Sequence, residues 1–444
     1  MGLFDRLRDW FWQPLMGDAW VERKTDLKLR SDYRRGVQRL PLKSKDDSII
    51  VNFVGLIVER AVSMLFGKPI VFDLPGEADS PEQIYIDTIW DNNHKSRLLK
   101  TLALYGAESG TCFVKILPDG AYDEEGKPIP RLVALDPATV RIETSADDYS
   151  NVTGYVIAYA VDNDDNRIYY KQTFEKQPNN TWFITDFQST NGNRWVQTGQ
   201  SVWEWEFAPI VHWQNLTEVG TPYGRPDITN DIIDLQDKLN FVVSNTAKII
   251  KYHAHPKTWG RSIGKMNEAR WGADEMILTD NPDAMIANLE MSSDLGSSLN
   301  FIKFMRQALF DVARSVDIDS LADKLGALTN FGLKVLYQDA LSKLEDKRGS
   351  YGEGLIQINH ILLELAGMPS DGGQVIWEDY LPANDVEITA GLQADMNMGL
   401  VSKQTAARMR GYDWESEEER LNDEKVAGDN VGAALLRAFG QGQQ

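Results

Sequence analysis

The passage Trp213-Gln-Asn-Leu-Thr-Glu-Val-Gly220-Thr-Pro-Tyr-Gly-Arg-Pro-Asp227 separates two parts of the chain with different periodicity. Its glycines and prolines predict a turn after a short strand, and an amphipathic helical pattern follows over residues 228–252. Residues 253–296 lack that pattern, which returns over residues 297–316 and 332–366. This order predicts an antiparallel helical hairpin with a small insert at its tip, followed by a long helix.

Upstream of the turn, the sequence predicts helices and then a meandering antiparallel β region. An apolar stretch ends at Gly67, with Pro69 just beyond, as is typical of a helix terminus. Further helices are predicted over residues 83–93 and 98–106. Between residues 112 and 213, short strand-like runs alternate with turn sequences, so this part of the chain is predicted to be mostly strand.

The two ends of the chain carry weaker patterns. Near the N-terminus, apolar residues at helical spacing predict an arm that docks on the parent domain or a neighbouring chain; they are Leu3, Phe4, Leu7, Trp10 and Phe11. A membrane-surface helix would look similar but lacks a basic face here. Towards the C-terminus, we predict a kinked long helix, a strand over residues 374–381 and helices within residues 386–409. The kink is predicted at Gly349, Gly352 and Gly354.

The composition limits the function classes. With 444 residues, 42% hydrophobic and 25% charged, the chain is typical of a globular protein of two or three domains. No apolar run approaches the roughly 18 residues of a membrane span, and no signal peptide is apparent, so we expect a protein of the cytoplasm. A net charge of −20 argues against a protein that binds nucleic acid over its whole surface.

Sequence motifs of catalysis and metal binding are missing. We find no phosphate-binding loop, no H-E-x-x-H, no G-x-S-x-G and no C-x-x-C. The single cysteine, Cys112, lies in an apolar strand-like run and is interpreted as a core residue. His253 and His255 would share one face of a strand, but a solvated segment end explains them better than a metal pair. We therefore predict no enzyme, no cofactor and no metal site.

The insert at residues 253–296 and its approach carry charge of both signs. Basic residues crowd its start and acidic residues its end, including Lys257, Arg261, Lys265, Arg270, Asp274 and Glu275. Such a segment could pair with its own copy on the next subunit, since ring contacts join different patches of identical chains. The equally weighted alternative is two exposed faces of a small α/β insert.

Taken in order, these segments resemble the portal proteins of tailed bacteriophages, of the siphophage type. Gly220-Thr-Pro-Tyr-Gly-Arg-Pro226 resembles the family's turn before its stem helix, and the helix over residues 228–252 is similarly rich in Asp and Asn. Gly332-Leu-Lys-Val-Leu-Tyr337 is similar to the start of the family's long helix and is the most specific local match. The resemblance covers most of the chain.

The resemblance implies an α+β portal fold. Its parts are an outer α/β wing, an antiparallel stem hairpin, a small α/β clip, and a long crossing helix leading to a helical crown. The implied boundaries are an N-terminal arm (1–45), the first part of the wing (46–226), a stem helix (227–252), a clip (253–296), a returning stem helix (297–316), a tunnel loop (317–331), a long kinked helix with a wing return strand (332–381), crown helices (382–425) and a C-terminal tail (426–444).

The resemblance also implies site residues. Those of the tunnel loop facing DNA would be Asp317, Asp319, Asp323, Lys324, Thr329 and Asn330, and the charged clip residues named above would dock a partner. Leu309 and Phe310 would pack the stem. Because one hairpin cannot bury the apolar faces of both its helices, we expect neighbouring subunits to bury these two residues.

The implied function is a homo-oligomeric ring, with twelve subunits expected, at one capsid vertex of the virion, assembled in the host cytoplasm. Double-stranded DNA would pass through its channel, where an acidic or neutral lining avoids retention. Further implied partners are the terminase large subunit, a head-completion or adaptor protein, and the capsid and scaffold proteins, with no membrane. Two alternatives remain: another phage structural adaptor, or a phage enzyme or nuclease accessory factor.

Overall fold

The computed structural model describes most of the chain in two compact units, residues 1–378 and 379–444. The residues described are 18–76, 80–118, 121–122, 126–163, 166–254, 258–261, 282–283, 285–288, 295–318, 330–368, 370–381, 385–409, 414, 417 and 420.

Helices open the first unit: α2 (Asp18–Arg34), α3 (Phe53–Phe66), α4 (Pro81–Asn92) and α5 (Lys95–Ser109). The Asn52 side chain caps α3 by accepting a hydrogen bond from the Gly55 amide at 3.0 Å. Helix α5 ends at Gly110, whose φ of +81° suits glycine. An added Cβ on Gly110 would lie 1.9 Å from the carbonyl oxygen of Gly224, and one on Gly224 would lie 2.3 Å from that of Gly110, so this close approach explains both glycines, the second of which belongs to the quoted turn.

The predicted antiparallel β region is confirmed, and the structure divides it into two sheets. An inner sheet has the order β3-β2-β9, and an outer sheet has the order β4-β5-β6-β7-β8. The inner strands are β2 (Thr111–Leu117), β3 (Arg131–Ala134) and β9 (Ile210–Gln214). The outer strands are β4 (Val140–Thr144), β5 (Val152–Asn163), β6 (Asn166–Lys176), β7 (Trp182–Ser189) and β8 (Val196–Trp203). One face of the outer sheet packs on the inner sheet through an apolar cluster that includes Phe113, Tyr155 and Phe174.

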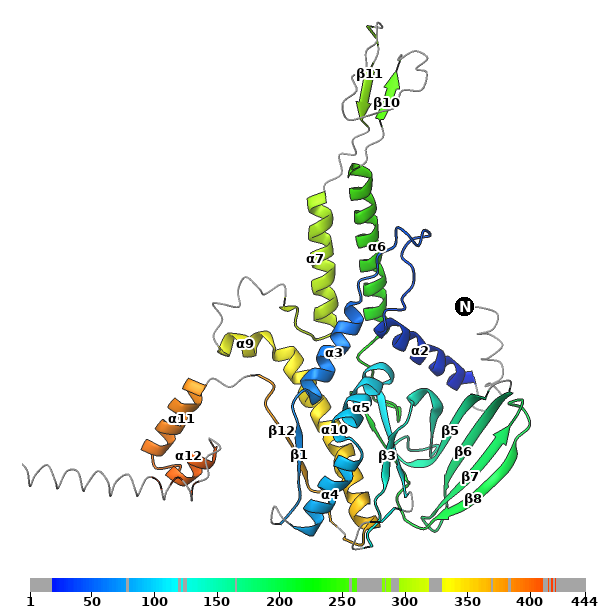
Figure 1. The fold of residues 1–444 in the computed structure, drawn as a ribbon, viewed down its shortest axis with the longest axis vertical. Helices are drawn as coiled ribbons and strands as arrows, with labels where there is room; N and C mark the ends of the chain where they lie inside the picture. The colour runs from blue at the N-terminus through cyan, green and yellow to red at the C-terminus, as the bar shows by residue number, and fades with distance from the viewer. Residues whose placement is uncertain are drawn as a thin grey trace, which may run out of the picture. The chain divides into compact units, whose positions relative to one another are not determined.

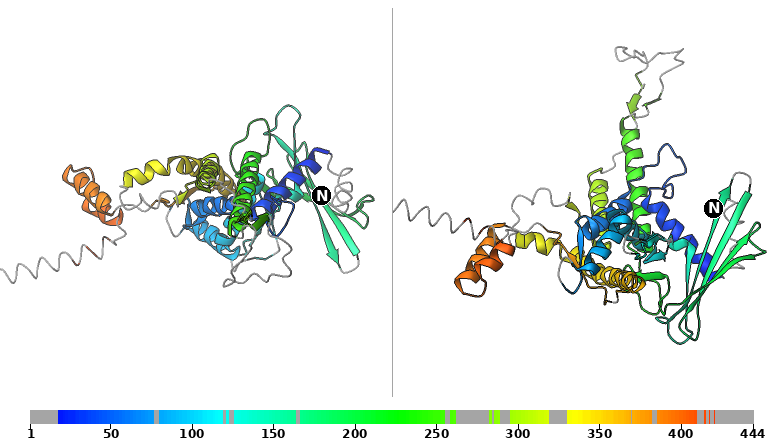
Figure 2. Two further views of the ribbon diagram at one scale, coloured as in Figure 1. Left: turned by 90° about the horizontal axis from the view of Figure 1, so that it is seen from above. Right: turned by 60° about the horizontal axis from the view of Figure 1, so that its bottom comes forward.

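The predicted helical hairpin is confirmed. Helices α6 (Asn230–Ala254) and α7 (Leu295–Val312) run side by side and project from the first unit, with the antiparallel strands β10 (Thr258–Arg261) and β11 (Met285–Asn288) between them in sequence (Figures 1 and 2). The apolar pattern at a period of about 3.6 residues decides this part of the fold, since it gives each helix one face to bury.

The long helix differs from the prediction. Helix α10 (Gln338–Leu365) continues through Gly349, Gly352 and Gly354, and the chain breaks earlier, at Tyr337, after the short helix α9 (Asn330–Leu336). The glycines therefore do not interrupt the helix, and a kink at them stays a prediction. Gly354 serves close packing, because an added Cβ would lie 2.3 Å from Cε3 of Trp213.

The first unit is closed by strand β12 (Gln374–Trp377), which pairs antiparallel with β1 (Ile70–Asp73). This pairing joins a strand near the start of the unit to a strand at its end. The second unit contains α11 (Asp385–Asn397) and α12 (Lys403–Met409), as the sequence predicts on either side of Gly399. Among the described helices, none is long and apolar enough to cross a membrane.

Candidate functional site

The base of the hairpin is a core built within one chain. Leu309 and Phe310 are 0% and 1% exposed, and they belong to a cluster that also draws on α3 and α6. The Phe310 ring meets that of Phe53 edge-on, with centroids 5.9 Å apart. The expectation that neighbouring subunits bury these two residues was therefore wrong, because α3 supplies the apolar surface that the hairpin itself lacks.

Apolar side chains remain exposed higher on the hairpin. Phe301 and Phe304 stack on α7 with centroids 6.3 Å apart, and they are 48% and 62% exposed. Leu299 is 50% exposed and lies on the other side of α7, since it precedes Phe301 by two positions and each residue turns a helix by about 100°. On α6, Phe241 and Ile250 are exposed on opposite sides by the same geometry. The hairpin thus carries apolar residues on two different surfaces.

A polar ladder on α6 holds the loop that precedes α3. Gln236, Asn240 and Ser244 are four positions apart, fully buried, and bonded to the backbone of Ile49 and Val51. The Gln236 amide donates to the Val51 carbonyl at 2.7 Å, and Asn240 Oδ1 accepts from the Val51 amide at 3.0 Å. These bonds satisfy backbone groups of a loop that has no strand partner. Sequence analysis missed this ladder, although polar residues at a four-residue spacing were visible.

A second group of polar contacts joins α2 to α6. The Tyr33 hydroxyl donates to Asp237 at 2.6 Å, and burial, reinforced by that hydrogen bond, raises the pKa of Tyr33. Arg39 also pairs with Asp237, at 3.3 Å. The Asp237 carboxylate is thus occupied by contacts within one chain.

A buried ionic cluster lies where the turn enters the hairpin. The Asp227 carboxylate is 0% exposed; it meets Lys347 Nζ at 2.5 Å and Lys343 Nζ at 2.9 Å, both from α10. Lys343 Nζ also donates to the Ala313 carbonyl at 3.0 Å, at the end of α7. Burial alone would raise the pKa of Asp227, but the two ammonium groups outweigh it and lower that pKa well below its ordinary range. The Asp227 carboxylate thus links the turn to the long helix, and Lys343 links the long helix to the end of α7.

A neutral hydrogen-bond chain continues from this cluster into the inner sheet. The Tyr351 hydroxyl donates to Asn215 Oδ1 at 3.0 Å and lies 3.3 Å from the Cys112 sulfur. Burial raises the pKa of the Cys112 thiol to about 12, so the thiol stays protonated and unreactive. The prediction that Cys112 is a buried core residue is confirmed.

The structure describes only some of the predicted site residues. Asp317, predicted to face DNA, instead has a buried side chain that pairs with Arg306 of α7 at 2.5 Å. Asn330 begins α9, and Arg261 is exposed on β10. The other predicted loop and clip residues lie outside the described residues: Asp319, Asp323, Lys324, Thr329, Lys257, Lys265, Arg270, Asp274 and Glu275.

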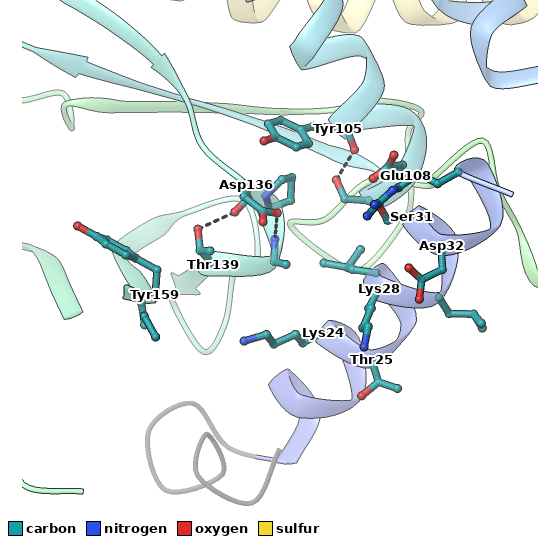
Figure 3. Close-up of a pocket in the computed structure, with 18 of the residues that line it drawn as sticks. Lys24, Thr25, Lys28, Ser31, Asp32, Tyr105, Glu108, Asp136, Thr139 and Tyr159 are labelled. Carbon is teal, nitrogen blue, oxygen red and sulfur yellow. Dashed lines mark hydrogen bonds between the residues drawn. The ribbon is translucent and has the colours of Figure 1, made fainter. Parts of the chain in front are cut away.

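The cleft between α2 and the outer sheet has a volume of about 920 Å³ (Figure 3). Two of its acidic residues are engaged in structural contacts: Asp136 caps a short helix by accepting from the Ala138 amide at 2.9 Å, and Glu108 pairs with Arg34. Lys24 and Lys28 line the opposite wall.

Histidines and acidic residues of the described ranges do not assemble a metal site, since no group of three potential ligands occurs among them. His212 is a core residue whose ring nitrogen lies 2.8 Å from the Tyr155 hydroxyl. Burial lowers the pKa of His212 to about 4, which keeps the ring neutral. The described part of the chain is thus organised around structural contacts.

Solved structures that are similar to the chain include three of gene transfer agent (GTA) particles. The neck of an empty GTA particle computed with C6 symmetry gives 12% identity, a TM-score of 0.48, and coverage of 81% of this chain and 90% of that one. The virion of a native gene transfer agent (GTA) particle gives 12% identity, a TM-score of 0.45, and coverage of 81% of this chain and 89% of that one. The neck of a native GTA particle computed with C12 symmetry gives 13% identity, a TM-score of 0.47, and coverage of 81% of this chain and 89% of that one. No curated protein gives a significant match.

The sequence profile described as "Phage portal protein, SPP1 Gp6-like" matches residues 18–427. This range includes α2, both sheets, the hairpin, the long helix and both helices of the second unit. A match of that extent covers the elements that build the fold rather than one shared motif. The chain therefore belongs to the SPP1 Gp6-like family of phage portal proteins.

Proposed function

We propose that the chain assembles into a closed ring of twelve subunits at one capsid vertex, and that the ring is the channel for DNA packaging and ejection. The observation that carries this proposal is the placement of exposed apolar residues on two different surfaces of the hairpin. A ring needs such an arrangement, because each head-to-tail contact joins one patch to a different patch of the next copy. Membership of the portal family supports the same assembly.

The parts of the chain take the roles that the family resemblance implies. The two sheets and their helices form the wing, α6 and α7 form the stem, and the segment carrying β10 and β11 forms the clip. The long helix α10 crosses back to the wing, and α11 and α12 belong to the crown. Twelve stems side by side would bury Phe301 and Phe304 and enclose the channel.

The loop between α7 and α9 would approach the DNA. Asp319, Asp323, Lys324, Thr329 and Asn330 are proposed as its DNA-facing residues. A loop beside moving DNA should make few lasting basic contacts, since each neutralised phosphate adds an attractive term that slows sliding. The buried Asp317–Arg306 pair would anchor the start of this loop to α7.

The clip is proposed to dock the terminase large subunit during packaging and a head-completion or adaptor protein afterwards, through Arg261 and its charged neighbours. Capsid and scaffold proteins would contact the ring at the virion vertex, after its assembly in the host cytoplasm. The subunit itself would act as a passage and docking site, with ATP hydrolysis supplied by the terminase.

Ring assembly can be tested with Phe304→Glu. A charge buried between subunits is costly, so the variant should remain folded but should not form rings in native mass spectrometry and negative-stain images. Val219→Glu is the matched control, because Val219 is 85% exposed and belongs to neither helix of the hairpin. Circular dichroism and the urea midpoint of both variants check the fold. Rings of Phe304→Glu at the control yield would refute the proposed contact.

A further inference from the structure

The outer sheet has a second face that the described chain covers only in part. Its residues follow from the strand register: Val156 and Ala158 on β5, Tyr169, Lys171 and Thr173 on β6, Phe183, Thr185 and Phe187 on β7, and Gln200 and Val202 on β8. We call this the Trp20 face, because Trp20 of α2 packs on Val156 and Ala158 and is 4% exposed. Figure 1 shows α2 lying against this part of the sheet.

Beyond α2, apolar side chains of the Trp20 face stay open. Phe183 and Phe187 on β7 are half-buried, and Val202 on β8 is 54% exposed. The neighbouring position on β8, Ser201, points to the opposite face, since side chains alternate along a strand. The open area therefore begins where the contact of Trp20 ends and runs across β7 to β8.

We propose that residues 1–16 of the same chain dock on this open part of the Trp20 face. The chain enters α2 at Asp18, two residues before Trp20, so the preceding segment starts on this face. As a helix, residues 1–16 would extend about 24 Å at roughly 1.5 Å per residue. Three strands spaced by about 4.8 Å span less than that length, so the segment can reach β8.

The chemistry of the segment matches the surface. Leu3, Phe4, Leu7 and Trp10 recur at helical spacing and give it one apolar face. The open part of this face offers two aromatic rings and a valine, beside the charged side chains of Lys171 and Glu175. Docking within one chain is favoured over docking between chains, because the covalent connection at Asp18 gives the segment an effective concentration in the millimolar range.

Disulfide trapping tests the proposal in the full-length chain. Leu7→Cys is combined with Gln200→Cys on the Trp20 face, or with Ser201→Cys on the opposite face as the matched control. Phe4→Cys and Trp10→Cys replace Leu7→Cys in parallel pairs, which covers neighbouring registers. The native Cys112 does not interfere, because it is buried and its pKa is about 12.

At least one pair with Gln200→Cys should form an intrachain disulfide several-fold faster than its Ser201→Cys counterpart, because docking would hold the two thiols on the same face of the sheet. Mass spectrometry of the denatured chain identifies the bond. Disulfide-linked dimers from the Gln200→Cys pairs would show docking on a second copy and overturn the proposal. Equal rates for the two series, or no bond in either, would overturn it as well. The test does not depend on ring formation.

Discussion

The buried cluster of Asp227, Lys343 and Lys347 makes the sharpest stability prediction. Asp227→Asn keeps the size of the side chain but removes the carboxylate that, among the described residues, pairs with two ammonium groups whose side chains are 10% and 4% exposed. Breaking a buried ion pair on one side costs about 3–5 kcal/mol, because the remaining charge stays buried without a partner. The folded-to-unfolded ratio should therefore fall by a factor of roughly a hundred to several thousand.

Urea unfolding followed by tryptophan fluorescence and circular dichroism measures this loss, with the subunit concentration held constant. Asp162→Asn is the control, because Asp162 is 77% exposed in its ion pair with Arg167 and its loss should leave the urea midpoint unchanged. The triple change Asp227→Leu, Lys343→Met and Lys347→Met should recover most of the lost stability, since apolar residues of similar volume often replace a buried ion cluster without cost.

The pH dependence gives an independent check. The pKa of Asp227 is lowered in the folded chain, so its ionised form stabilises the fold. That contribution is fully present above the unfolded carboxyl pKa of about 3.9 and is lost as the pH falls through the lower folded-state value. Wild type should lose this stability below about pH 3.9, and Asp227→Asn should not. If Asp227→Asn lowers the free energy of unfolding by less than about 1 kcal/mol at neutral pH, the claim that it leaves two buried lysines without a partner is refuted.

Three further predictions concern other parts of the chain. Gly110→Ala should lower the free energy of unfolding by more than about 1 kcal/mol in the same urea assay, because of its positive φ and the Gly224 carbonyl 1.9 Å from the new Cβ. Cys112 should not react with a thiol reagent at pH 8 until urea unfolds the chain, since its pKa is about 12; fast labelling of the native protein would contradict its burial. Replacing Asp319 and Asp323 by Lys should leave rings intact but slow DNA packaging, most at low salt, and wild-type rates at all salt concentrations would place the loop away from DNA.

The sequence by itself determined the element order and the family. Periods of about 3.6 and 2 residues report local hydrogen bonding and the side of each element that is apolar. Those signals located the turn at residues 213–227, the hairpin, the antiparallel β region and the two short C-terminal helices. They also predicted the burial of Cys112, because an apolar strand-like run rarely places its small residues in water.

Only the tertiary structure decided which surfaces meet. Leu309 and Phe310 were visible as an apolar pair on a helix, but their partner could not be read from α7, because it is supplied by Phe53 on α3. The same holds for Gly354, since only the structure shows that its missing Cβ makes room for the Trp213 ring. Periodicity specifies that a face is buried and leaves the burying element open.

The partners of the buried charges were likewise decided by the tertiary structure. Asp227 and Lys347 are 120 positions apart in sequence, and each is unremarkable in its local context. A lysine on a helix usually reaches solvent, and an aspartate before a helix usually caps it. Their pairing depends on α10 crossing the start of the hairpin, a contact between distant segments that no local pattern encodes. The sequence therefore determined the parts of this portal protein, and long-range packing decided how its turn, hairpin and long helix are joined.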